Sequence, residues 1–142
     1  STLLSKWHEK RLQKKLINTN LFIVAMVSKL KEIYPDGTIY LDSVMQSTKD
    51  FYFVLSVMES GTENVGIDVQ NVSFLIDIAL IDNKSDKKLV NELVSCCGAF
   101  FNTITIDSQT LFPENYLPDE TDGVQHIRFT LGFPQYIEWS EK

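Results

Sequence analysis

Cysteine, histidine and glycine are scarce in this 142-residue chain, which contains two, two and six of them. The two cysteines, Cys96 and Cys97, are neighbours in a predicted helix, whose geometry points their side chains apart and disfavours a disulfide between them. We expect both to be core thiols of a protein from a reducing compartment. A metal site would need more Cys or His at ligand spacing, so we expect neither a metal nor another cofactor.

Catalytic motifs are missing as well. The chain has no P-loop, G-x-G-x-x-G, H-E-x-x-H, C-x-x-C or G-x-S-x-G motif, and no nucleophile or ligand set accompanies His8 or His126. Asp77 lies in an apolar predicted strand. It is either a buried carboxylate with a shifted pKa or an acid near a sheet edge or an interface, and we favour the second interpretation. These absences predict a protein that is not an enzyme and has no catalytic residues.

Long apolar runs are also lacking. Because no stretch of about 18 apolar residues occurs, we expect no membrane span and no membrane partner. A chain of this length is expected to form a single domain with its own core. We place that α+β domain at residues 20–142, after a basic, helical N-terminal arm at residues 1–19.

Basic side chains are rare beyond residue 31. Residues 1–31 contain seven Lys or Arg and one Glu, a net charge of +6, whereas residues 32–142 contain six Lys or Arg and eighteen Asp or Glu, a net charge of −12. Such an acidic body should avoid nucleic-acid phosphates.

The basic cluster of the arm consists of Lys10, Arg11, Lys14 and Lys15. It is open to three interpretations: a solvated helix face, a contact with an acidic neighbour, or nucleic-acid binding. The third is the weakest, because apart from Trp7 the arm lacks aromatic side chains that could stack on bases.

The clearest structural pattern is the apolar alternation in residues 71–82. Side chains of a strand alternate between two faces, so one face of this segment is wholly apolar and must meet a core. That face consists of Val72, Phe74, Ile76, Ile78 and Leu80. The other face carries Asp77 among mostly apolar neighbours, which is typical of a central strand with partial cover.

Three helices are expected, at residues 2–17, at residues 21–34 and after the central strand, ending near Phe101. Asn20 is the expected N-cap of the second helix and Ser85 that of the third. Pro35-Asp36-Gly37 ends the second helix.

The remaining pattern predicts strands at residues 38–41, 51–58, 102–107 and 124–133, with a turn at residues 60–64. Residues 108–123 contain two prolines and no helical period, and predict a long acidic loop. Its acidic residues include Glu114, Asp119, Glu120 and Asp122. The predicted fold class is α+β: a mostly antiparallel sheet with one helix packed on a face, preceded by N-terminal helices.

The run Tyr34-Pro35-Asp36-Gly37-Thr38-Ile39-Tyr40-Leu41-Asp42-Ser43-Val44-Met45-Gln46, preceded by an amphipathic helix, resembles the start of phage tail terminator proteins. In that family a helix leads into a strand of the pattern Y-P-D-x-x-I-Y-x-D-x-V-x-Q and then into an aromatic-rich strand, here Phe51–Val54. The order of the later elements is also similar, and the likeness covers roughly residues 21–137. The chain departs from the family at Ser47 and at Thr48–Asp50, where Gly and Pro are usual, and in its basic arm.

The resemblance implies a structural virion protein with a tube-protein-like fold. Such proteins form a hexameric ring on the head-proximal end of the tail tube of a phage or phage-tail-like particle, and they stop tube polymerisation. The implied partners are further copies of the chain, the tail tube protein, and the connector or, in a contractile tail, the sheath protein. DNA would pass through the ring without specific binding. The implied location is the virion tail, assembled in the cytoplasm of the bacterial host.

Within such an assembly we expect two groups of contact residues. The first comprises the basic cluster together with Tyr40 and Asp42, near the strand edges at residues 38–41 and 51–58. The second is the acidic loop, which would face the lumen or an adjoining ring and repel DNA phosphates.

An acidic α+β domain also suits a different class of protein, a small immunity or inhibitor protein that covers the basic active site of a toxin. Size in solution distinguishes the two. A tail terminator should form a ring of about six subunits, whereas an immunity protein should be a monomer or dimer that binds one toxin tightly.

Overall fold

The computed structural model describes residues 19–42 and 48–136 of the chain. The helices in these residues are α2 (Thr19–Ile33) and α3 (Lys87–Phe100). The strands are β1 (Thr38–Leu41), β2 (Phe51–Asn64), β3 (Val69–Asp82), β4 (Ile104–Ile106), β5 (Gln109–Leu111), β6 (Glu114–Thr121) and β7 (Val124–Tyr136). The expected helix at residues 2–17 lies outside the described residues.

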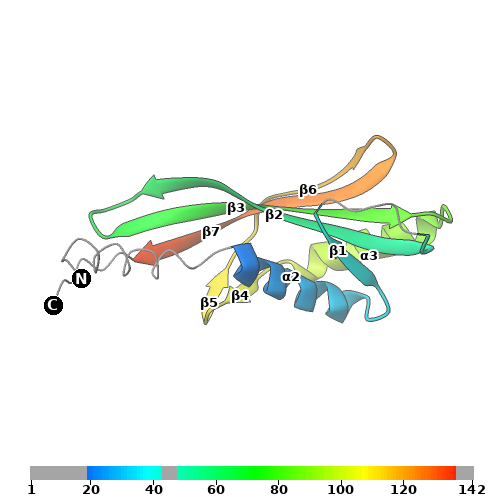
Figure 1. Ribbon diagram of the computed structural model, residues 1–142, viewed down its shortest axis with the longest axis horizontal. Helices are drawn as coiled ribbons and strands as arrows, with labels where there is room; N and C mark the ends of the chain where they lie inside the picture. Colours follow the sequence, from blue (N-terminus) through cyan, green and yellow to red (C-terminus); the bar gives the residue numbers. More distant parts are fainter. Residues whose placement is uncertain (1–18, 43–47, 137–142) are drawn as a thin grey trace, which may run out of the picture.

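Five of these strands form one sheet in the order β1-β2-β3-β7-β6, while β4 and β5 pair as a small separate hairpin. Every neighbouring pair is antiparallel except β1 and β2, which are parallel. Both helices lie on one side of the large sheet (Figure 1). The α+β class with a mostly antiparallel sheet is confirmed, although α2 as well as α3 packs on the covered face.

The core lies between the helices and the covered face of the sheet. The apolar face predicted for residues 71–82 is confirmed, because all five of its side chains are buried. Phe22, Met26 and Leu30 recur every four residues along α2, and their side chains pack into the same core from the helix side. The ring of Phe22 stacks on Phe74 with centroids 4.0 Å apart, which fixes α2 against the middle of the sheet.

The helix starts differ from the prediction. The N-cap of α3 is Asp86, whose carboxylate accepts a hydrogen bond from the backbone N–H of Leu89 at 3.1 Å. Ser85 instead has a positive φ of 54° and belongs to the preceding turn. Asn20 is inside α2, which already begins at Thr19.

The predicted turn at residues 60–64 is wrong. These residues belong to β2, which continues to Asn64 and pairs with β3 through a bulge between Glu59 and Gly61. Glycine and asparagine are disfavoured in strands, but here the ladder of backbone hydrogen bonds with β3 outweighs their low strand propensity. The connection between the two strands lies at residues 65–68.

The predicted acidic loop at residues 108–123 is also wrong. Glu114, Asp119 and Glu120 lie in strand β6, which pairs with β7, and Asp122 lies in the turn between β6 and β7. As an edge strand, β6 leaves most of its side chains exposed, so its sequence lacks the apolar alternation by which strands are recognised.

The two cysteines differ in environment. Cys97 is buried against the core, as predicted, and burial raises the pKa of its thiol to about 12. Cys96 is exposed and free, so the prediction of a second core thiol is wrong. Neither helix in the described part of the chain has the length and hydrophobicity needed to cross a bilayer.

Candidate functional site

No described helix covers the face of the sheet opposite α2 and α3 (Figure 1). Strand register decides which side chains reach it, because residues directly opposite one another on paired strands share a face. The pairs Ser56–Asp77 and Asp77–Arg128 therefore place one row of polar residues across β2, β3 and β7. Half-buried and exposed apolar residues, among them Leu75 and Met58, flank this row.

A polar cluster on this face links three strands. Arg128 of β7 donates from Nε to Asp77 Oδ2 of β3 at 3.0 Å and from Nη1 to Asp119 Oδ2 of β6 at 3.1 Å. The Nδ1 atom of His126 lies 2.8 Å from Asp77 Oδ1. The hydrogen bond to Asp77 is the largest of the interactions that raise the pKa of Arg128, so its guanidinium stays charged. The cluster therefore fastens β6 and β7 to the central strand.

Asp77 was expected near a sheet edge or an interface with a donor within reach. The donors are there, but the sheet-edge position is wrong, since β3 is the middle strand of the sheet. The expectation of an interface stays a prediction. Asp77 is not fully buried either, because its side chain is 29% exposed. The open face explains this, as the carboxylate keeps partial contact with water while it accepts from Arg128.

An Asp–His pair can prepare an imidazole for general-base catalysis when a nucleophile meets its other nitrogen. Within residues 19–42 and 48–136, no hydroxyl or thiol hydrogen-bonds to His126, whose ring interacts with Asp77. Nor do the described residues include a group of three or more His, Cys, Asp or Glu that could hold a metal ion. The geometry of the cluster fits a structural role, in which hydrogen bonds between side chains link neighbouring strands.

The residues predicted as assembly contacts are scattered. Tyr40 lies in β1, half-buried, with its ring edge-on to Tyr52 at 5.3 Å, so it packs within the subunit. Asp42 is exposed just after β1, and its backbone N–H donates to the carbonyl of Leu55. The basic cluster Lys10, Arg11, Lys14 and Lys15 lies outside the described residues.

The strand edges differ in how open they are to a neighbouring strand. At the predicted edge of residues 51–58, β1 pairs with residues 52–55 of β2, and β1 is itself the outermost of the described strands on that side of the sheet. The edge strand β6 carries Pro118, two acidic residues beside it and a register shift between Glu114 and Leu117. Proline, charge and bulges are the features by which proteins prevent edge-to-edge pairing. Contacts with other molecules are therefore expected through side chains rather than through the β6 edge.

The ribbon, as we call residues 58–70, lies at one end of the molecule and comprises the outer half of β2, the turn at residues 65–68 and the first two residues of β3, which also pair with β7 (Figure 1). Every residue from Met58 to Asp68 is exposed, so this part of β2 and its turn contribute nothing to the core. At the tip, Val65 is 52% exposed and Ile67 is 91% exposed. The charged residues of the ribbon are all acidic, namely Glu59, Glu63 and Asp68. The ribbon thus carries an apolar tip on an acidic stem.

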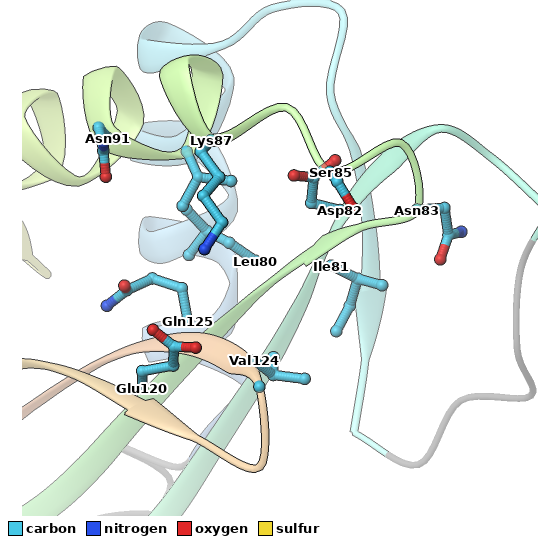
Figure 2. A pocket seen from close by; sticks show the side chains of 12 residues that line it. Leu80, Ile81, Asp82, Asn83, Ser85, Lys87, Asn91, Glu120, Val124 and Gln125 are labelled. Carbon is cyan, nitrogen blue, oxygen red and sulfur yellow. The ribbon is translucent and has the colours of Figure 1, made fainter.

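A pocket of about 300 Å³ lies at the other end, where β3, the start of α3 and the β6–β7 turn meet (Figure 2). Its lining combines an apolar group with a polar group. The apolar group consists of Leu80, Ile81, Val90 and Val124. The polar group includes Lys87, Asn91, Gln125 and two carboxylates, those of Asp82 and Glu120.

The Lys87 side chain extends within this pocket toward Gln125 and Glu120 (Figure 2). Among the described residues no carboxylate lies within the 4.0 Å of an ion pair with its ammonium group. Lys87 is also the first residue of α3, where the helix dipole adds partial positive charge. This side of the pocket therefore favours an anionic group.

Sequence reasoning missed the ribbon and the pocket. The signal for the ribbon tip was present in Val65-Gly66-Ile67-Asp68, in which a glycine separates two apolar residues outside any expected core face. The pocket left no local signal, because its lining comes from three segments that only the fold brings together.

Comparisons with known proteins add little. No known family's sequence profile matches the chain, and no curated protein matches it. Among the solved structures that resemble it, one without a functional description is 13% identical, covers 87% of this chain and 99% of its own, and has a TM-score of 0.48. A similarity this distant has no bearing on function.

Proposed function

We propose that the chain is a structural subunit of a phage tail or phage-tail-like particle, which assembles into a ring on the head-proximal end of the tail tube. There it stops polymerisation of the tube and joins the tail to the connector or the sheath. The observation that carries the proposal is the ribbon of residues 58–70, whose apolar tip is exposed in a single subunit. We take this protruding pair of apolar side chains as the candidate contact site.

Three further features support an assembly role. The sheet has one face without helices, which leaves a broad surface for neighbours (Figure 1). The polar cluster around Asp77 stiffens that surface by linking β3, β7 and β6. The order of the elements, with a helix before Tyr34–Leu41 and an aromatic-rich strand after it, agrees with the resemblance to tail terminators.

Particle size and tube length test the proposal together. Mass photometry and electron microscopy of the full chain should reveal rings of about six subunits, and tube protein polymerised in its presence should give shorter tubes with one closed end. Tubes of unchanged length and a chain that stays monomeric at every concentration would refute the proposal.

The acidic surface of β6 and of the β6–β7 turn, where Glu114, Glu120 and Asp122 are exposed, favours the second candidate, an inhibitor of a basic toxin. In that case the chain should remain a monomer or dimer and form a tight one-to-one complex with the toxin. Raised salt should slow formation of that complex, because the attraction between exposed charges is screened.

A further inference from the structure

We infer that the ribbon tip of one copy inserts into the pocket at the start of α3 of the next copy, and that this head-to-tail contact builds the ring. The inference rests on the proposed function, since it supplies the subunit contact that a ring requires. It names the occupant of the pocket as residues 65–68 of a second copy.

Position is the first argument. The tip and the pocket lie at opposite ends of the long axis of the molecule (Figure 1). A chain cannot fill its own pocket across that distance, so the contact joins two copies through different surfaces. Contacts of this heterologous type generate a closed ring when the rotation between copies closes, and an open filament otherwise.

Chemical complementarity is the second argument. Ile67 is 91% exposed on a subunit in solution, and the pocket offers Ile81, Val90 and Val124 as apolar partners. Burial of such a side chain against them removes apolar surface from water on both copies. Val65, on the other side of Gly66, can cover the outer part of the same apolar lining.

Charge is the third argument, and it fixes the orientation of the tip. Asp68 follows Ile67 directly, and Lys87 places at a helix N-terminus an ammonium group that forms no ion pair with another described residue. A carboxylate placed there meets both the ammonium charge and the helix dipole. Asp82 and Glu120, also in the pocket lining, both repel an acid, so the tip should enter with Asp68 on the Lys87 side.

Sedimentation velocity of the full chain over a range of concentrations tests the apolar part of the contact. Ile67→Asp should weaken self-association about 100-fold, as expected for a residue at the centre of an interface. The matched control is Phe112→Asp, which changes an exposed aromatic residue outside both the tip and the pocket and should leave association unchanged. Equal effects of the two substitutions would overturn the contact.

A charge exchange tests the orientation. Asp68→Lys and Lys87→Asp should each weaken association about tenfold or more, and the chain that carries both should recover to within about threefold of the wild type. Both positions are exposed, so these variants should fold normally. Glu120→Gln should strengthen association, because it removes a like charge facing Asp68.

The outcomes separate this contact from the proposed function. Rings that form and cap tubes but do not respond to Ile67→Asp or to the charge exchange overturn the contact and leave the capping role standing. A double variant no better than the single variants overturns the pairing of Asp68 with Lys87. A wild-type chain that never associates, with or without tube protein, overturns both proposals.

Discussion

Removal of the Phe22 side chain should detach α2 from the sheet. Phe22 is fully buried, stacks on Phe74 with centroids 4.0 Å apart and meets Phe133 edge-on at 6.2 Å. Truncation of a buried phenylalanine to alanine typically costs about 3–5 kcal/mol, the sum of lost burial and the cavity that remains. Loss of two aromatic contacts, each about 0.5–1.5 kcal/mol, places Phe22→Ala toward the upper part of that range.

Urea unfolding followed by circular dichroism measures this cost, with the free energy extrapolated to water. Phe22→Leu retains most of the volume and should cost about 1–2 kcal/mol. The matched control, Leu21→Ala, changes the neighbouring residue, which is 39% exposed, and should cost less than about 1 kcal/mol. If Phe22→Ala and Leu21→Ala had equal small effects, α2 would not pack on the sheet through this face, and the assignment of the open face would fail with it.

Three further predictions concern stability. Asp86→Ala should cost about 1 kcal/mol by the same urea assay, because it removes the cap on the N–H of Leu89, and no change would show that water replaces the cap. Unfolded Cys97 ionises above pH 9.0 and the folded thiol only near pH 12, so its contribution is intact below pH 9.0 and falls as pH rises through this window. Relative to Cys97→Ala, the wild type should therefore lose up to about 1.4 kcal/mol per pH unit above pH 9, and parallel pH profiles would contradict this. The double variant Asp77→Ala/Arg128→Ala should lose less free energy of unfolding than the sum of the two single variants, and this coupling should shrink in high salt. Full additivity would argue that the Asp77–Arg128 pair does not stabilise the sheet.

The buried parts of the fold could be predicted from sequence because burial leaves a periodic pattern. The alternation from Val72 to Leu80 predicted the covered face of β3, and the four-residue spacing of Phe22, Met26 and Leu30 along α2 is a pattern of the same kind. In both cases the repeat of the strand or helix places the apolar residues on the one face that packs against the core. The local sequence is therefore sufficient to predict that face.

The exposed parts could not be predicted in this way. Strand β6 and the outer half of β2 are each held by backbone hydrogen bonds to the next strand along the chain, and most of their side chains meet water. Side chains in water are under no pressure to alternate, so a strand and a loop look alike there. The pairing of Asp77 with Arg128 depends in turn on the register of β3 and β7, which becomes certain only when the sheet is formed.

The bulk of the free energy of folding comes from the layer between helices and sheet, and the stretch from Met58 to Asp68 takes no part in it. A change of residue in that stretch should leave the melting temperature almost untouched, yet alter which surfaces the molecule can adhere to. Amide hydrogens there should exchange with solvent long before those of Ile76 or Ile78. The molecule thus separates what keeps it folded from what selects its neighbours, and the second can vary without penalty to the first.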